Sequence, residues 1–259
     1  ARRAGAVAKV VPAPTARRPA ASCRARVRAR ESIVIIWTVA EGDTILRLAL
    51  RIESHLAGEQ VAVGAPSPRG RAAGVERLDG LCLESAEARG KHLLLHFGPL
   101  VLHSHLGMSG GWHLYPPNAA WWRPRSAAWA VLSGADQEAV QFGGPTLRLL
   151  TAERVRRDPQ LSGLGPDVLA ADFDTAAVVA ALRADPARPI GEALLDQRLL
   201  AGIGNIFKSE ACFAARVDPW RPVGALSDGE LHAVLVAARE QMRDAVESGR
   251  KTFSVYRRR

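Results

Sequence analysis

Residues 195–208 read LDQRLLAGIGNIFK, and this stretch decides the fold of the second half of the chain. Two short helical patterns flank a tight turn that contains Gly202 and Gly204, and glycine lets one backbone approach another closely. Asn205 stands at the head of the second helical pattern, where it is suited to be the N-cap. Free backbone N–H groups at such a helix start also form a ready phosphate site. The spacing therefore predicts a helix–two-turn–helix.

Helical patterns continue on both sides of this segment. Apolar spacing predicts helices over residues 173–183, 190–195 and 206–215, and a short helix or turn over residues 151–157. The run Ser-Asp-Gly-Glu at 227–230 is a capping-box pattern, which opens a last helix that stops at Gly249. The chain is thus rich in helix from about residue 151 onward.

The residues before 150 follow a different pattern. A helix is expected from Asp43, with Asp43 or Thr44 as its cap and Gly58 just past its end. Short alternating runs then predict strands over residues 60–63, 80–87, 92–97, 101–105, 127–132 and 139–142. Strands at this spacing favour a β-sandwich or a barrel. The expected fold class is α+β, with domains over residues 39–150 and 151–259.

Composition limits the classes of protein to which the chain can belong. The 259 residues carry a net charge of +9, and residues 1–38 hold most of it, so bulk charge does not predict nucleic-acid binding for the rest. Three widely spaced cysteines form no CxxC, which argues against a disulfide framework or a four-cysteine zinc site and favours a reducing, intracellular setting. No apolar run reaches the roughly 18 residues that a membrane span needs.

Residues 1–38 form a basic, low-complexity leader without a helical or strand period. Three interpretations stay open: a disordered tail, an Arg-rich transit peptide, or a segment that is not native because translation starts at Val39. The choice matters for chemistry, because only the third interpretation places the residue after Val39 at a chain terminus.

Three further stretches carry residue types that are suited to chemistry. Glu41 lies directly before the expected first helix, where an acid is ordinarily a capping residue. Lys91 enters a strand, where a lysine is ordinarily solvated. His103 and His105 share a strand face, but no carboxylate lies nearby in sequence to complete a metal site, so we expect no bound metal. The glycine-rich turn after them presents Met108 outward, where it could act as an apolar wedge between DNA bases.

Together and in this order, these stretches resemble the formamidopyrimidine-DNA glycosylase and endonuclease VIII family, above all its actinobacterial endonuclease VIII branch. Residues 40–44 are similar to the family's N-terminal Pro-Glu-Gly-Asp-Thr, and residues 90–92 to its catalytic-lysine strand. Residues 105–110 match its His-Leu-Gly-Met-Ser-Gly turn, and residues 195–210 match its helix–two-turn–helix. The likeness implies an N-terminal β-sandwich with a leading helix, followed by a helical helix–two-turn–helix domain that binds DNA.

The resemblance also implies an activity: a base-excision-repair DNA glycosylase and abasic-site lyase that removes oxidised bases, mainly pyrimidines. The α-amine of Ala40 would attack the sugar C1′ and form a Schiff base. Glu41 would move protons at the sugar, and Lys91 would bind phosphate and support the acid–base steps. The strand would then be cut by β-elimination, with or without δ-elimination. The residues assigned to DNA contact are His105, Met108, Asn205 and Lys208.

The implied partner is double-stranded or bubble DNA that contains oxidised bases or abasic sites. The protein itself is expected to be a bacterial, cytoplasmic, nucleoid-associated monomer that uses no cofactor and binds no membrane. Two alternatives stay open: a catalytically degenerate protein that grips damaged or abasic DNA, and an unrelated β-plus-α protein that binds RNA.

Two positions depart from the family pattern. Ala40 stands where the family has proline, and its nitrogen can attack only as a chain terminus. The lyase therefore requires that translation starts at Val39 and that the initiator is removed. The chain stops at Arg259 without the family's four-cysteine zinc finger. We therefore expect weaker DNA binding and weaker δ-elimination than in family members that have the finger.

Overall fold

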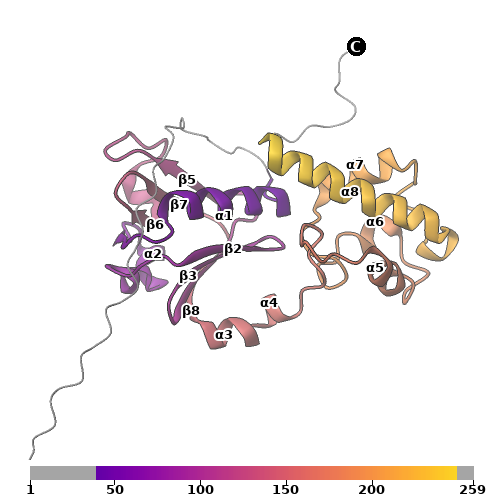
Figure 1. Ribbon diagram of the computed structural model, residues 1–259, viewed down its shortest axis with the longest axis horizontal. Helices are drawn as coiled ribbons and strands as arrows, with labels where there is room; N and C mark the ends of the chain where they lie inside the picture. The colour runs from indigo at the N-terminus through magenta and orange to yellow at the C-terminus, as the bar shows by residue number, and fades with distance from the viewer. Residues whose placement is uncertain (1–38, 250–259) are drawn as a thin grey trace, which may run out of the picture.

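The computed structural model describes residues 39–249, which form a β-rich half followed by a helical half (Figure 1). The elements of the β-rich half are α1 (Gly42–Leu56), β1 (Ala62–Gly64), α2 (Pro68–Ala72), η1 (Val75–Leu78), β2 (Ser85–Arg89), β3 (His92–Phe97), β4 (Leu100–His105), β5 (Gly111–Tyr115), η2 (Arg125–Ala127), β6 (Ala128–Ser133), β7 (Glu138–Phe142) and β8 (Thr146–Thr151). The elements that follow are α3 (Ala152–Arg157), α4 (Pro159–Ser162), α5 (Thr175–Leu182), α6 (Ile190–Ala193), α7 (Asn205–Ala214), η3 (Val223–Ala225) and α8 (Asp228–Ser248).

Two antiparallel sheets form a sandwich in the β-rich half. One sheet has the strand order β1-β6-β7-β5, and the other has the order β2-β3-β4-β8. Apolar side chains of both sheets and one face of α1 meet in a shared core, which includes Ile45, Ile52, Leu93, Leu102 and Leu132. Burial of each such side chain contributes about 1.5–3 kcal/mol, so the inward face of each strand is strongly fixed. The predicted α+β class, with a β-sandwich and a leading helix, is confirmed.

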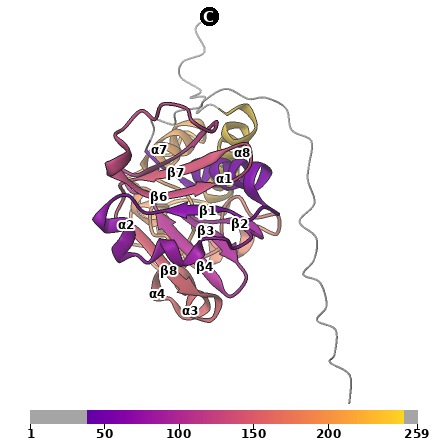
Figure 2. The same cartoon turned by 90° about the vertical axis from the view of Figure 1, so that its left-hand side faces the viewer.

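The outer face of the second sheet is polar at one end and apolar at the other. β3 and β4 pair so that His92 lies opposite His105, and Leu94 lies opposite His103. Leu94 belongs to a small apolar cluster with residues of α3 and α4. These two helices lie along the lower edge of the sandwich in Figures 1 and 2. The histidines lie at the other end, toward the helical half.

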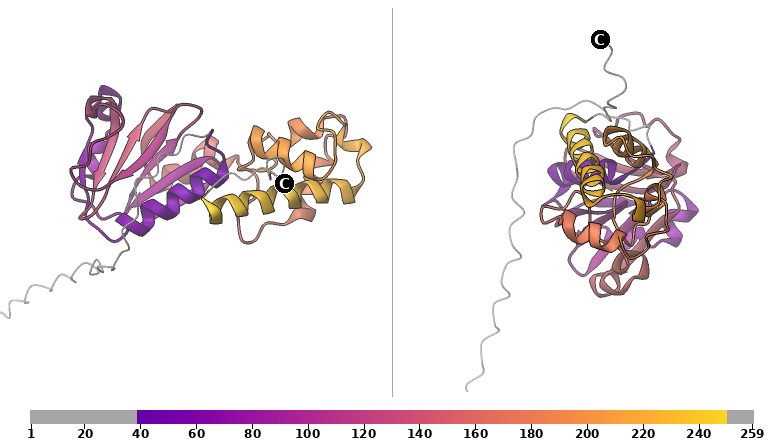
Figure 3. Two further views of the ribbon diagram at one scale, coloured as in Figure 1. Left: turned by 90° about the horizontal axis from the view of Figure 1, so that it is seen from above. Right: turned by 90° about the vertical axis from the view of Figure 1, so that its right-hand side faces the viewer.

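The helical half has a core of its own, in which α8 packs against α5 and α7 (Figures 1 and 3). The capping box at the start of α8 is confirmed: Ser227 Oγ accepts the Glu230 N–H at 3.2 Å, and the Glu230 carboxylate accepts the Ser227 N–H at 2.7 Å. Gly249 ends the helix with a left-handed φ of 69°. The N-terminal part of α8 lies far from the sandwich, whereas its last turns lie beside α1 (Figure 3).

The start of α1 differs from the sequence prediction. The helix begins at Gly42 with Glu41 at the N-cap position, so the prediction that Asp43 or Thr44 caps it is wrong. Asp43 is buried in the first turn and pairs instead with Arg47, with 3.3 Å between the carboxylate and the guanidinium. The chain can start the helix earlier because Gly42 hydrogen-bonds to the helical half, a contact that no local pattern reveals.

Some strands also differ from the predictions. β5 and β8 are not predicted, because β5 follows a glycine-rich turn directly and the β8 run TLRLLT lacks a clean alternation. The predicted strand over residues 80–87 begins only at Ser85, since Cys82 forms an isolated bridge with Gln60. The domain boundary near residue 150 stays a prediction. The predictions for residues 1–38 and for the chain after Gly249 concern residues outside those that the structure describes.

Candidate active site

Glu41 lies at the junction between the two halves and is fully buried. Its carboxylate accepts three backbone N–H bonds from the start of α7: Oε1 from Ile206 at 2.8 Å, and Oε2 from Gly204 at 3.0 Å and Phe207 at 3.2 Å. The first N–H groups of a helix have no partner within the helix and form the positive end of its dipole. Glu41 therefore caps α7 from the other half of the molecule.

This contact corrects the prediction for Asn205. The N-cap of α7 is Gly204, and Asn205 is the first helical residue. A Cβ at Gly204 would collide with the Glu41 carboxylate, so a side chain at this position has no room. Asn205 is exposed instead, and its Oδ1 accepts a 2.8 Å hydrogen bond from Lys208 Nζ. Two of the predicted DNA-contact residues are thus joined on the surface of α7.

Ala40 directly precedes Glu41 and is half-buried against the sandwich core. Two residues later, Gly42 donates its N–H to the Gly202 carbonyl at 2.9 Å, which ties the start of α1 to the two-turn segment. Gly202 has a φ of 101°, which glycine adopts without strain, and Gln197 Oε1 accepts its N–H at 3.0 Å. In this chain Val39 precedes Ala40, so the Ala40 nitrogen is a planar peptide nitrogen and no nucleophile.

The turn between β2 and β3 carries Lys91 to the same segment. Gly90 donates its N–H to Asp167 Oδ2 at 2.7 Å, and Asp167 Oδ1 accepts the Leu169 N–H at 2.9 Å. A Cβ on Gly90 would lie 3.1 Å from the Cβ of Ala201, so glycine permits this close approach. Sequence reasoning missed Asp167, because a single acid in a loop has no distinguishing local pattern.

His105 lies beside Lys91 at the end of β4. Its ring centroid is 4.7 Å from that of His92 on the neighbouring strand. Burial, together with the nearby charge of Lys91, lowers the pKa of His105. At neutral pH, therefore, this position offers a neutral imidazole for hydrogen bonding, and Lys91 supplies the positive charge.

A chain of hydrogen bonds runs from His92 toward the lower edge of the sandwich. Arg148 Nη2 lies 2.9 Å from His103 Nδ1, and His103 Nε2 lies 2.8 Å from His92 Nδ1. A guanidinium can only donate, so His103 accepts at Nδ1 and must donate from Nε2 to His92. Asp158 lies 3.0 Å from Arg148 and completes the chain.

Both histidines of this chain are neutral near pH 7. Burial is the main cause that lowers the pKa of His92 to about 3 and the pKa of His103 to about 4. The charge of Arg148 lowers both pKa values further, while Asp158 acts in the opposite direction. The chain therefore fixes the tautomers of two rings without adding charge to them.

Met108 is 81% exposed on the turn between β4 and β5. Gly107 before it has a φ of 58°, and the turn is backed by buried polar side chains. Ser104 Oγ accepts hydrogen bonds from Trp112 Nε1 at 3.1 Å and from Gln141 Nε2 at 3.0 Å. A projecting methionine on a well-supported turn fits the predicted wedge, whose role stays a prediction.

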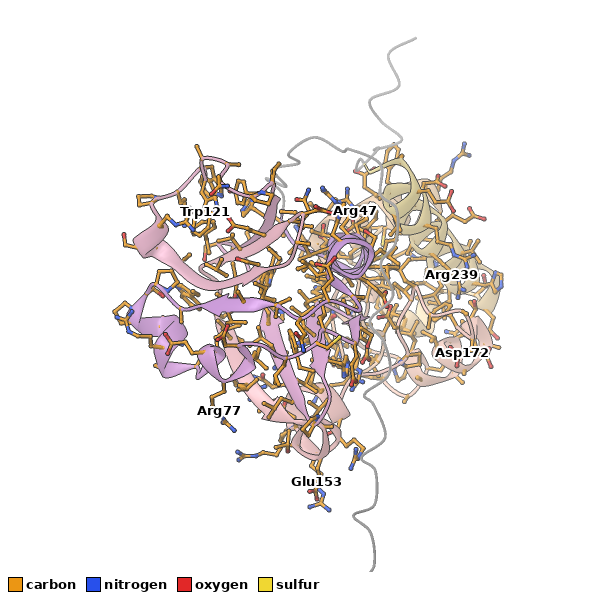
Figure 4. The ribbon with its side chains drawn as sticks, turned by 60° about the vertical axis from the view of Figure 1, so that its left-hand side comes forward. Arg47, Arg77, Trp121, Glu153, Asp172 and Arg239 are labelled. Carbon is orange, nitrogen blue, oxygen red and sulfur yellow. The ribbon has the colours of Figure 1, made fainter. Side chains whose placement is uncertain are left out.

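The structure gathers the predicted catalytic residues around the two-turn segment: Ala40, Glu41 and Lys91. His105 and Met108 extend this region over the sandwich, and Asn205 and Lys208 extend it over α7. Arg47, close to the start of α1, lies where the two halves meet in Figure 4. The individual roles of these residues stay predictions.

Within residues 39–249, no group of three or more His, Cys, Asp or Glu side chains is arranged to hold a metal ion. His92, His103 and His105 lie together, but they contact one another and Arg148. No helix in the same range has the length and apolar character needed to cross a membrane.

Comparison with known proteins gives matches over both halves. The formamidopyrimidine-DNA glycosylase N-terminal domain matches residues 39–146, and the formamidopyrimidine-DNA glycosylase H2TH domain matches residues 164–257. The probable endonuclease 8 2 of Streptomyces coelicolor is 44% identical over 189 residues, which span 72% of this chain and 67% of that protein. A DNA-(apurinic or apyrimidinic site) lyase of Mycolicibacterium smegmatis is 36% identical over 191 residues, 73% of this chain and 71% of that protein. The structure of Lactococcus lactis formamidopyrimidine-DNA glycosylase bound to abasic-site DNA has a TM-score of 0.70 at 24% identity, and the match covers 81% of this chain and 82% of that chain.

Proposed function

The chain belongs to the formamidopyrimidine-DNA glycosylase and endonuclease VIII family, and we propose that it removes oxidised bases from DNA and cuts the strand at the abasic site. The observation that carries this proposal is the buried Glu41 carboxylate, which directly follows Ala40 and caps α7. The family members named above include an endonuclease 8 and an abasic-site lyase, and a solved relative binds abasic-site DNA. The proposed substrates are oxidised pyrimidines in double-stranded or bubble DNA.

The nucleophile in this proposal is the α-amine of Ala40. An α-amino group has a pKa of about 8, so a useful fraction is unprotonated at neutral pH. The amine attacks C1′ of the flipped-out nucleotide, the bond to the base breaks, and the amine and sugar form a Schiff base. A primary amine gives an imine that has to gain a proton to become a strong electrophile, whereas proline gives an iminium that is already cationic.

Glu41 and Lys91 serve this chemistry in different ways. Glu41 exchanges protons with the sugar as the ring opens and during elimination, and its three N–H donors hold the carboxylate in a fixed orientation. Lys91 is held near the two-turn segment by the bond between Gly90 and Asp167, where its charge favours a DNA phosphate. No metal or other cofactor takes part in the proposed reaction.

The remaining predicted residues bind and deform the DNA. Asn205 and Lys208 form a hydrogen-bonded pair on the surface of α7, where the Lys208 ammonium can bind a DNA phosphate. The N–H groups of Gly204, Ile206 and Phe207 do not form the expected phosphate site, because they already donate to Glu41. His105 offers an imidazole next to Lys91. Met108 fills the gap that the flipped base leaves in the stack. Because the relatives are bacterial, we place the reaction in the cytoplasm, at the nucleoid.

One observation favours a second candidate function. With Val39 attached, the Ala40 nitrogen is an amide, and the protein could then grip abasic DNA without forming a Schiff base. The two functions differ in one product, because only a Schiff base is reduced by borohydride to a permanent protein–DNA bond.

The test compares a chain that begins at Ala40 with the 259-residue chain, each incubated with oxidised-base duplex and borohydride. We expect a covalent adduct only from the chain that begins at Ala40, and no adduct from its Glu41→Gln variant. N-terminal sequencing of protein from its host should then identify Ala40 as the first residue. Absence of an adduct from the Ala40 chain, with intact DNA binding, would favour the second function.

A further inference from the structure

The connection between β5 and β6, residues 116–127, folds back over the outer face of its sheet. Trp121 and Trp122 pack there against an apolar cluster that includes Tyr115 and Phe142. The rings of Trp121 and Tyr115 are stacked at 6.0 Å, and Trp121 Nε1 donates a 3.2 Å hydrogen bond to the Glu138 carboxylate. The loop is therefore anchored to the sheet by its two indoles.

Each indole carries an arginine on its outer side. The guanidinium of Arg123 lies 4.2 Å from the ring centroid of Trp122, and that of Arg125 lies 4.0 Å from the ring centroid of Trp121. The attraction between a cation and an aromatic face holds each guanidinium in place. A guanidinium that stacks by its flat face keeps its N–H groups in the plane, where they can reach an outside acceptor.

These two arginines stack on indoles instead of pairing with a carboxylate, although Glu138 binds the indole on which Arg125 stacks. Neither Arg123 nor Arg125 forms an ion pair within residues 39–249, in contrast to Arg148 with Asp158 or Arg221 with Glu230. Burial, with the charge of Arg123 as a further cause, lowers the pKa of His113 to about 4, so this neighbour adds no competing charge at pH 7. We call Trp121, Trp122, Arg123 and Arg125 the Trp–Arg surface.

The Trp–Arg surface adjoins the turn that carries Met108. The ring centroids of Trp122 and Phe142 are 6.0 Å apart. The next residue, Gly143, lies against that turn, because a Cβ added to it would lie 3.2 Å from the Ser109 carbonyl oxygen. In Figure 1, β5 lies along the same upper edge of the molecule as α7. Figure 4 shows Trp121 at the opposite edge of the sandwich from Glu153 of α3.

We propose that the Trp–Arg surface is a DNA-backbone site, at which Arg123 and Arg125 bind phosphates of the duplex beyond the Met108 turn. The planar guanidinium matches the geometry of a phosphate, and contacts of this kind do not depend on base sequence. The indoles hold the two donors ready, so little side-chain freedom is lost when the DNA binds. The inference rests on the proposed function, because it takes damaged duplex DNA as the ligand.

The test measures how the affinity of the full chain depends on salt. Fluorescence anisotropy gives Kd for a duplex with an uncleavable abasic-site analogue between 50 and 200 mM salt. The variants are Arg123→Gln, Arg125→Gln, the double variant, and the matching lysine substitutions. Arg154→Gln is the charge-matched control, since Arg154 is exposed on α3 at the opposite edge of the sandwich.

Each lost phosphate contact lowers the slope of log Kd against log salt by about 0.9, so the slope of the double variant should be lower than that of the wild-type chain by about 1.8. Between 50 and 200 mM salt, the double variant should then lose about 12-fold less affinity than the wild-type chain. The lysine variants should keep most of the slope, and Arg154→Gln should keep all of it. Circular dichroism of each variant checks that the fold is intact.

A double variant with the wild-type slope would overturn the proposal, as would an equal loss of slope in Arg154→Gln. Loss of slope in the lysine variants as well would also count against it, because that result indicates packing instead of charge. The outcome is independent of the lyase chemistry: if the Ala40 chain forms no borohydride adduct, the proposed function fails while the salt slopes still decide this site.

Discussion

Substitution of Glu41 by Gln should destabilise the junction as well as stop base release. The amide keeps one oxygen, so it can replace Oε1 or Oε2 but not both, and its NH₂ group then faces a backbone N–H of α7. Hydrogen bonds to a charged group contribute about 1.5–3 kcal/mol, and a buried N–H without a partner costs about 1–3 kcal/mol. We therefore expect a loss of about 2–4 kcal/mol, which for a domain of this size corresponds to roughly 5–15 °C in Tm.

Two assays separate this effect from a general loss of stability. Calorimetry gives Tm, and amide hydrogen exchange followed by NMR reports on the Ile206 and Phe207 N–H groups individually. Exchange at these two amides should accelerate more than exchange in the core of α8. Glu240→Gln is the control, because Glu240 is an exposed carboxylate on α8. Wild-type exchange rates at both amides and a Tm shift below about 1 °C would refute the capping role.

Four further predictions concern the junction and the hydrogen-bonded histidines of the second sheet. Gly204→Ala should lower Tm about as much as Glu41→Gln, since the added methyl displaces the carboxylate; an unchanged Tm by calorimetry would contradict this. Asp167→Asn leaves only one acceptor for two N–H groups, so it should cost about 1–3 kcal/mol in denaturant unfolding and slow strand cleavage, with abasic-DNA affinity retained. The free energy of unfolding should fall as the pH drops from about 6.5 to about 4. In this range His103 takes up a proton in the unfolded chain but stays neutral in the folded chain. Each group of this kind contributes a slope of at most about 1.4 kcal/mol per pH unit. Arg148→Met removes one cause of that pKa shift. The free energy of unfolding of this variant, measured in urea over the same pH range, should therefore fall less steeply as the pH drops. A slope equal to that of the wild-type chain would argue against the coupling between Arg148 and His103.

The parts of the fold that the sequence predicts are those governed by short-range pattern. The capping box at Ser227 and the strand over residues 92–97 match the structure because their signals lie within a few residues of each other. β8 is not predicted because Leu150 lies on the outer face of the sheet, covered by α3 and α4, so an apolar residue stands where a solvent-facing strand would have a polar one.

The same distinction between short-range patterns and long-range contacts applies to the site. Glu41 and Lys91 stand out in the sequence through their neighbours, but what holds them could not be predicted. The Glu41 carboxylate caps a helix that starts 164 residues later, and Asp167 reaches Gly90 from the far side of the junction. Such pairs depend on how the two halves dock. For the same reason Asn205, which has the right residue type and position for an N-cap, is displaced from that role by an acid in the other half.

The bonds at Glu41 also indicate which of its oxygens is available for chemistry. A carboxylate offers about four lone-pair sites, two on each oxygen. Oε2 uses both of its sites for Gly204 and Phe207, whereas Oε1 uses one for Ile206. Proton exchange at Oε1 can therefore proceed while α7 stays capped, but exchange at Oε2 would cost a capping bond. Because Glu41 is fully buried, a sugar can reach Oε1 only when the groups that cover it move. The carboxylate would then hold the two halves together and serve the reaction at once, so DNA binding has to open the approach to Oε1 without separating Oε2 from α7.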